Sequence, residues 1–136
     1  MFKYERRAYY HETDQMGIIH HSNYLKWMEE ARIALMDKLG FSYKKMEDLG
    51  IISPVIFASC EYKKPVLFND DVTICVSVEE YNGLKLTFNY EIINNNGDVS
   101  TIGKTKHCFM KNNQIISLKR TLPEFHDVFV KFMENE

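Results

Sequence analysis

The chain has 136 residues and a formal net charge of −2, and its composition is 45% hydrophobic and 26% charged. This length predicts one domain, residues 1–136, with one core, and the near-neutral charge excludes a general surface for nucleic acid or anionic membranes. No apolar run approaches the roughly 18 residues of a membrane span, and the first ten residues lack a signal-peptide core, so we expect no membrane insertion.

The cysteines indicate a compartment. Cys60, Cys75 and Cys108 are odd in number and far apart, in strand-like segments. Free cysteine usually behaves as a small buried hydrophobe, and unpaired cysteines are typical of a reducing environment. No ligand spacing such as His-x-x-x-His accompanies the adjacent His20 and His21. We therefore expect three buried thiols, no metal and a cytoplasmic protein.

The first part of the chain predicts one strand and one long helix. Residues 2–9 alternate like a strand, and residues 14–21 form a loop. The helix is expected to begin at Ser22 or Asn23, either of which can cap it, and to end at Leu39 before Gly40. Apolar residues cover most of its circumference, a pattern typical of a helix enclosed by its own domain.

The remaining segments predict antiparallel strands. Asn82-Gly83 and Asn96-Gly97 are hairpin turn signals between alternating segments. A short helix is expected over 43–49, strands over 55–62, 72–78, 86–92, 99–110 and 114–118, and a last helix over 123–133. A single curved antiparallel sheet wrapped around one long central helix accommodates all of these segments. The predicted fold class is therefore α+β.

The segment from Tyr10 to Tyr24 concentrates the chemistry of this chain. It joins a strand to the long helix, so Asp14 and the free N–H groups of the helix N-terminus can face the same point. Such N–H groups stabilise an oxyanion, and a carboxylate beside them can act as a base or a nucleophile. Gly17 allows a positive φ or a close approach of the backbone to a substrate. Taken alone, Asp14 also suits a turn or a cap.

A family resemblance rests on these residues. The pattern Tyr10-x-x-Thr13-Asp14-x-x-Gly17-x-x-x-His21-x-x-Tyr24, followed by Glu29-x-Ala31-Arg32, resembles that of the hotdog-fold acyl-CoA thioesterases. More narrowly, it is similar to the 4-hydroxybenzoyl-CoA thioesterase class and its Tol-Pal-associated branch. A second block, Tyr62-Lys63-Lys64-Pro65 with Asp70 five residues on, also matches that family. Gln15 and Met16 depart from the small residues common there, which affects the predicted shape of the acyl pocket.

The resemblance implies a hotdog fold and a homodimer or homotetramer with active sites at the dimer interface. It also implies hydrolysis of an acyl-CoA thioester without a cofactor. The catalytic carboxylate falls on Asp14, as nucleophile or general base. The oxyanion site falls on the helix N-terminus at or next to His21, whose ring is expected to support the water or the substrate.

Further residues are expected to contact the substrate. Gly17, Ile18 and Tyr24 surround the predicted reaction centre. The chain has no glycine-rich phosphate loop, so the phosphates of CoA need basic side chains. Lys63 and Lys64 are the first candidates for that role, and the others are Lys104, Lys106 and Arg120. Glu29 and Arg32 stand three residues apart on the helix and are predicted to form an ion pair.

Two other functions remain open on the sequence. One is the same hydrolysis performed on thioesters of an acyl-carrier protein. The other is a non-catalytic module that binds acyl-CoA. A serine hydrolase is disfavoured because the chain has no Gly-x-Ser-x-Gly elbow. The residues leave the preferred acyl group and the choice between dimer and tetramer undecided.

Overall fold

The computed structural model describes residues 1–136, which form an α+β fold with one five-stranded antiparallel sheet in the order β1-β3-β4-β5-β2. The strands of this sheet are β1 (Phe2–Arg7), β2 (Val55–Tyr62), β3 (Asp71–Tyr81), β4 (Lys85–Ile93) and β5 (Val99–Cys108). The two predicted hairpin turns join β3 to β4 and β4 to β5. The predicted α+β class and the antiparallel sheet are therefore confirmed, but the prediction of a single sheet is wrong. Met110–Lys111 and Gln114–Ile115 pair in a separate two-stranded sheet, because the turn at Asn112 and Asn113, both with positive φ, folds them back on each other.

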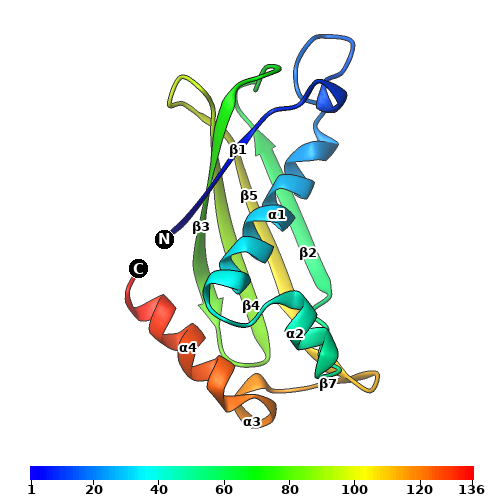
Figure 1. Ribbon diagram of the computed structural model, residues 1–136, viewed down its shortest axis with the longest axis vertical. Helices are drawn as coiled ribbons and strands as arrows, with labels where there is room; N and C mark the ends of the chain where they lie inside the picture. The colour runs from blue at the N-terminus through cyan, green and yellow to red at the C-terminus, as the bar shows by residue number, and fades with distance from the viewer.

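Helices cover one face and one end of the sheet (Figure 1). The longest, α1, lies across the face, and α4 packs near the end that carries the β3–β4 hairpin. The helices are η1 (Tyr10–Glu12, a 3-10 turn), α1 (Ser22–Lys38), α2 (Tyr43–Asp48), α3 (Leu118–Thr121) and α4 (Pro123–Glu134), and a small hairpin is formed by β6 (Met110–Lys111) and β7 (Gln114–Ile115).

Only one stripe of α1 is buried in this chain. The buried side chains recur every three or four residues, which is the spacing of one helix face; they are Tyr24, Trp27, Met28, Ala31, Arg32, Leu35 and Met36. Leu25 is 41% exposed, and Ile33 and Ala34 are half-buried. The prediction of a helix enclosed on most sides is therefore wrong for the single chain, because the sheet lies against one side of α1.

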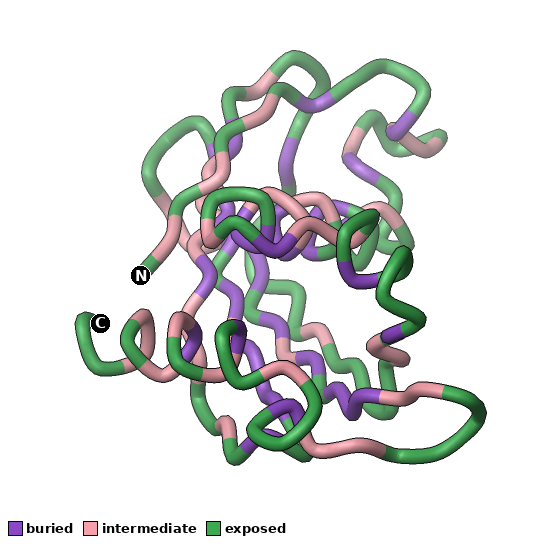
Figure 2. Tube along the Cα trace, turned by 60° about the horizontal axis from the view of Figure 1, so that its bottom comes forward, coloured by how far each residue is buried: buried purple, intermediate pink, exposed green.

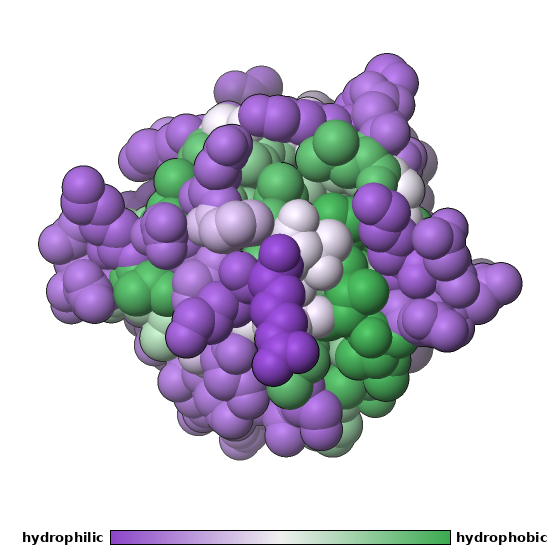
Figure 3. Space-filling model, turned by 90° about the horizontal axis from the view of Figure 1, so that it is seen from below, coloured by the Kyte–Doolittle hydropathy of each residue, from purple (hydrophilic) through white to green (hydrophobic).

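The core continues to the C-terminal end of the molecule. Phe125 and Phe129 on α4 are fully buried and stack with their ring centroids 5.4 Å apart. Phe129 also lies edge-on to Tyr81 at the end of β3. Figure 2 shows that buried positions alternate along the strands beneath the helices. When the molecule is viewed from the end that carries α3, hydrophobic residues form a band bordered by hydrophilic residues (Figure 3).

Gly103 on β5 allows α1 to approach the sheet closely. A Cβ atom at this position would collide with the terminal Cε of Met28 and lie 2.7 Å from its Sδ, and it would come within 3.3 Å of the Ser59 carbonyl oxygen. Met28 is fully buried and cannot swing out into solvent. The absence of a side chain at Gly103 therefore sets the distance between helix and sheet.

We expect Gly103→Ala to reduce the free energy of unfolding by about 1–3 kcal/mol, the usual cost of overpacking a filled core. Urea denaturation at neutral pH measures this loss. Met28→Ala alone should cost about 2–5 kcal/mol as a core truncation, and combined with Gly103→Ala the total loss should be smaller than the sum of the two, because the smaller residue removes the collision. An additive double variant would show that Met28 is not the cause.

The cysteine prediction is partly wrong. All three thiols are free, but only Cys108 is buried, while Cys60 and Cys75 are half-buried. Cys60 lies on the edge strand β2, which has only one neighbour, whereas Cys75 lies on β3, between β1 and β4.

None of the helices is both long enough and apolar enough to cross a membrane.

Candidate functional site

A groove of about 450 Å³ lies where the N-terminus of α1, the loop before it and the end of β2 meet. Ten residues line it: Asp14, Met16, Ile18, Ile19, His21, Tyr24, Tyr62, Lys63, Lys64 and Pro65. Both sequence blocks of the resemblance therefore reach the same groove, although about 40 residues separate them in the chain. Gly17 lies within the same loop, between two lining residues.

The loop holds Asp14 in a defined position. One oxygen of its carboxylate, Oδ1, accepts the backbone N–H of Met16 at 2.8 Å, and the Gly17 N–H donates to the Asp14 carbonyl at 3.0 Å. This turn requires the positive φ of +80° at Gly17, and a Cβ there would meet nothing within 4 Å. Gly17 is thus needed for its backbone conformation, since no neighbour crowds it. The carboxylate is half-buried.

The start of α1 is not capped as predicted. His21 occupies the position before the helix, and the Ser22 amide donates to Nδ1 of His20 at 3.2 Å. Asn23 donates from its side chain to the Glu12 carbonyl at 2.9 Å and so ties the helix to η1. The His21 amide makes no backbone hydrogen bond. An N–H group at a helix N-terminus that lacks a backbone partner is available to a carbonyl oxygen in the groove.

Aromatic side chains form one wall of the groove. Tyr24 is buried and lies edge-on to Trp27, and its ring centroid is 5.5 Å from that of Tyr62. The Tyr62 hydroxyl donates to the His21 carbonyl at 3.3 Å, which links the end of β2 to the start of α1. Tyr62 belongs to the second sequence block, but the sequence indicated no role for it.

Backbone hydrogen bonds to β5 hold Lys63 and Lys64 at the groove. Both of their amides donate to the Ser100 carbonyl, at 2.8 and 3.1 Å. Their ammonium groups are about half exposed and contact only exposed carboxylates, Glu61 at 3.9 Å and Asp98 at 3.3 Å. The three other predicted phosphate ligands, Lys104, Lys106 and Arg120, do not line this groove. Lys104 instead pairs with Glu79 at 2.9 Å.

Glu12 lies two residues before Asp14, and the sequence indicated no role for it. Its carboxylate is buried, and it accepts hydrogen bonds from Arg6 Nη1 at 2.8 Å, the Tyr9 amide at 2.8 Å and Trp27 Nε1 at 2.7 Å. Its carbonyl accepts the His20 amide. One side chain thus joins β1, η1 and α1 two residues before Asp14.

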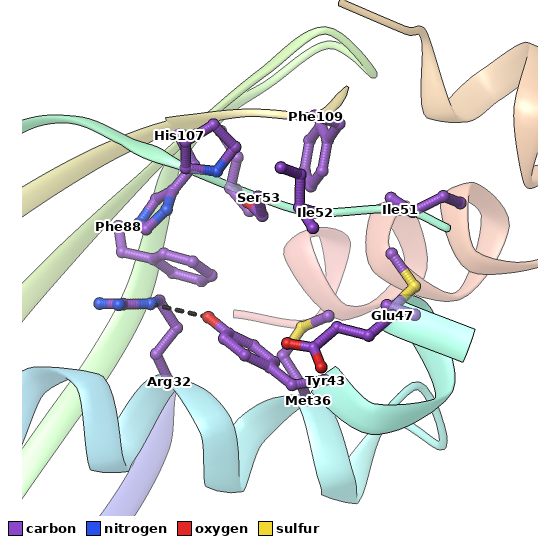
Figure 4. A pocket seen from close by; sticks show the side chains of 13 residues that line it. Arg32, Met36, Tyr43, Glu47, Ile51, Ile52, Ser53, Phe88, His107 and Phe109 are labelled. Carbon is purple, nitrogen blue, oxygen red and sulfur yellow. Dashed lines mark hydrogen bonds between the residues drawn. The ribbon is translucent and has the colours of Figure 1, made fainter. Parts of the chain in front are cut away.

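A second cavity, of about 240 Å³, lies at the other end of α1, among α1, α2, β4 and β5 (Figure 4). Arg32 is buried there, and it donates from Nε to the Tyr43 hydroxyl at 2.9 Å and from Nη1 to the Tyr90 hydroxyl at 3.2 Å. The predicted contact with Glu29 is present at 3.9 Å. The sequence indicated no role for Arg32 beyond this ion pair, whereas its spacing from Ala31 and Leu35 puts it on the buried stripe.

His107 lies on β5 beside Arg32. Its Nε2 is 2.8 Å from Thr105 Oγ1, and the residue is 1% exposed. Burial, together with the nearby Arg32 charge, lowers the pKa of His107 to about 4. The ring is therefore neutral at pH 7.

The free energy of unfolding is expected to fall by about 2 kcal/mol between pH 7 and pH 5 because of His107. The unfolded chain takes up a proton there near pH 6.5, whereas the folded chain resists until about pH 4, so acid favours unfolding across that interval. Urea denaturation at both pH values measures the effect. His107→Gln should flatten the pH dependence by that amount, while His11→Gln, at an exposed position, should not.

Comparison with known proteins places the chain in a family. A model of the thioesterase-like superfamily matches residues 10–134. YneP of Bacillus subtilis, named as a candidate acyl-CoA thioesterase, is 39% identical over 131 residues, which is 95% of each chain. The structure of a DHNA-CoA thioesterase from Staphylococcus aureus is 40% identical, with a TM-score of 0.91 over 96% of this chain and 89% of that one. A gentisyl-coenzyme A thioesterase structure is 29% identical, with a TM-score of 0.81 over 89% and 98%.

The chain belongs to the thioesterase-like superfamily. It is a thioester hydrolase with the hotdog fold of its structural relatives. The first sequence block of the resemblance, from Tyr10 to Tyr24, begins at the residue where the family match begins.

Proposed function

We propose that the chain is an acyl-CoA thioesterase that releases a free acid and CoA from a small to medium acyl-CoA. The observation that carries this proposal is the groove, in which the Asp14 carboxylate and the N-terminus of α1 with the unbonded His21 amide line one surface. The names of similar proteins support CoA as the thiol, since they include acyl-CoA, DHNA-CoA and gentisyl-coenzyme A thioesterases.

Each side of the groove supplies one part of the reaction. The helix N-terminus at His21 polarises the thioester carbonyl and stabilises the oxyanion. Asp14 then attacks the carbonyl carbon or removes a proton from a water molecule. The C–S bond breaks, and CoA leaves as a thiolate and takes up a proton from the water that is consumed. Where Asp14 has attacked, this water hydrolyses the Asp14–acyl anhydride, which frees the acid and restores the carboxylate. No metal or organic cofactor enters these steps.

The groove also suits the two ends of the substrate. Gly17, Ile18 and Tyr24 provide a backbone turn and an apolar wall beside the carbonyl site. Lys63 and Lys64, at the outer end of the groove, are free to meet the phosphates of CoA, since their present partners are exposed carboxylates. Met16 is 76% exposed at the rim and can fold over the acyl group, as its flexible thioether allows.

A homodimer through β2 is part of this proposal. As an edge strand, β2 has exposed residues along nearly its whole length, including Val55, Ile56 and Phe57, which are 46–51% exposed. An uncovered apolar edge strand is a template for pairing with another chain. Two-fold pairing of β2 with the partner's β2 would place a groove at each end of the interface, with α1 as the central helix of each sheet. Two such dimers would make the tetramer.

Phe57→Lys is expected to convert the dimer to a monomer, because it sets two ammonium groups near one another across the two-fold axis. Sedimentation velocity at micromolar protein measures the change. Leu84→Lys, on the β3–β4 hairpin, is the matched control, since Leu84 is 45% exposed but distant from β2. A wild-type chain that sediments as a monomer would contradict the proposed dimer.

Thiol release from a panel of acyl-CoAs tests the activity. The panel contains short, medium and long aliphatic chains and hydroxylated aromatic acids, because two structural relatives are named for aromatic acyl groups. Turnover on at least one CoA ester is expected. Release only from acyl-carrier-protein thioesters would transfer the same chemistry to the other substrate class. Saturable binding without release would identify a binding module instead.

Cytoplasmic localisation follows as an expectation from the three free thiols, because such cysteines persist in a reducing compartment. Fractionation of cells that express the tagged chain measures it.

A further inference from the structure

The second cavity contains a buried positive charge that no buried carboxylate balances. The side chain of Arg32 is 6% exposed, and its two hydrogen-bond acceptors, Tyr43 and Tyr90, are neutral hydroxyls. The nearest carboxylate, Glu29, is 63% exposed and lies 3.9 Å from Nη2. A buried guanidinium is normally paired with an anion, because its desolvation is costly. Arg32 can therefore accept an anion from the cavity.

The walls of the cavity suit an apolar body. Phe88 on β4 and Phe109, directly after β5, face it from the sheet side. Met36 on α1 and Ile51, in the segment after α2, face it from the opposite side (Figure 4). All four are buried. The volume is about 240 Å³, and a cavity of about 150 Å³ is enough for one benzene molecule. One aromatic ring or a short aliphatic chain fits beside the guanidinium.

The other polar groups leave Arg32 as the only positive charge in the cavity. His107 is neutral at pH 7 because burial and the Arg32 charge lower its pKa. Glu47, from α2, lines the cavity and is exposed, but it forms no ion pair with Arg32. Ile52 lies on the segment between α2 and β2, lines the cavity and is 53% exposed, so this wall of the cavity borders solvent.

We propose that this cavity is a binding site for a carboxylate carried on a small apolar body. The carboxylate pairs with the guanidinium of Arg32, which can present two N–H groups in one plane. The Tyr43 hydroxyl, already held by Arg32 Nε, has its own hydrogen free to donate to the same anion. The ring or chain packs against Phe88 and Phe109.

Two kinds of molecule can supply the carboxylate that binds to Arg32. One is a free carboxylic acid, which is also the class of product that a thioesterase releases. The other is the distal carboxylate of an acyl group bound in the groove of a partner, and this source rests on the proposed function. The cavity opens before the start of β2 and the groove lies at its end, roughly 25 Å apart along the strand. Two-fold antiparallel pairing of β2 would bring one protomer's cavity beside the other's groove.

Calorimetric titration of the full chain with benzoate and with benzamide tests the site. Benzoate is expected to bind at least tenfold more tightly, because only the carboxylate can pair with Arg32. Arg32→Met should remove that preference. Ile52→Trp, at the exposed mouth, should weaken binding of both compounds at least tenfold without changing the fold. Ile115→Trp, 67% exposed on β7 and outside the cavity, is its control.

Equal affinity for benzoate and benzamide would overturn the proposal, as would unchanged binding in Ile52→Trp. These outcomes decide the question even where Arg32→Met does not fold, and they require no turnover. Failure of the proposed function would therefore be seen separately, in the thiol-release panel.

Steady-state kinetics then distinguish the two sources. If the distal carboxylate is the ligand, Arg32→Met should raise KM for adipoyl-CoA at least tenfold and leave KM for hexanoyl-CoA unchanged. If the free acid is the ligand, benzoate should alter the rate of the wild-type chain but not of Arg32→Met, and both KM values should stay the same. Either result supports the carboxylate site. Kinetics that respond to neither ligand, together with absent benzoate binding, would overturn it.

Discussion

Replacing Asp14 with Asn is expected to lower kcat for thioester hydrolysis by about 10²–10⁴-fold, the usual contribution of a positioned base or nucleophile. The folded structure should persist, because the Asn side-chain oxygen can accept the Met16 amide as Asp14 Oδ1 does. An amide has neither the basicity nor the charge that the reaction needs. Thiol release under saturating acyl-CoA, beside a thermal melt, measures both expectations.

Asp70→Asn is the matched control for this variant. Asp70 also accepts a backbone amide in a turn, with its Oδ2 lying 3.0 Å from the Leu67 nitrogen, but it does not line the groove. It should keep kcat within about twofold of the wild type. A fully active Asp14→Asn enzyme would remove Asp14 from the mechanism and leave the helix terminus to act alone.

Isotope labelling separates the two roles proposed for Asp14. In single turnovers in ¹⁸O water, label in Asp14 requires an acyl-enzyme anhydride that water opens at the Asp14 carboxyl carbon. Label only in the released acid arises either from activation of a water molecule or from opening of the anhydride at the acyl carbon, and trapping of the anhydride with hydroxylamine separates these two routes. Mass spectrometry of the peptide that contains Asp14 reads the difference.

Glu12→Ala is expected to reduce the free energy of unfolding by about 3 kcal/mol, near the lower end for breaking a buried ion pair. It leaves Arg6, whose side chain is 7% exposed, and the indole N–H of Trp27 without their shared acceptor. Arg6 keeps a contact with Glu30 at 3.2 Å and lies 4.6 Å from the centre of the Trp27 ring, so the loss is not larger. Urea denaturation measures the change.

A double variant shows whether the charge pair causes that loss. Arg6→Met combined with Glu12→Met removes both charges and should be more stable than Glu12→Ala, because no buried ion remains unpaired. Activity should still fall in both variants, since Glu12 holds the loop that carries Asp14. A loss below about 1 kcal/mol in Glu12→Ala would show that solvent replaces the carboxylate.

The sequence determined most of the local structure. The strand predicted over 55–62 is β2 at its observed bounds, Val55–Tyr62, and the glycines at 40 and 50 follow the ends of α1 and α2 with positive φ. The loop before α1 could also be predicted from the sequence, because the Asx turn in it depends on residues only two or three positions apart. Such features follow from backbone preferences and short-range hydrogen bonds, which a sequence pattern reports directly.

Only the tertiary structure decided which polar groups are buried and what they face. Glu12 meets Trp27 across 15 residues, and Arg32 meets Tyr90 across 58. The many apolar residues of α1 predicted a helix enclosed on most sides, whereas only one stripe of it is buried. Arg32 lies on that stripe and is buried together with its apolar neighbours. Whether a charged side chain is buried depends on the residues that pack around it. Those residues are distant in the chain, so no repeating pattern in the sequence reports them.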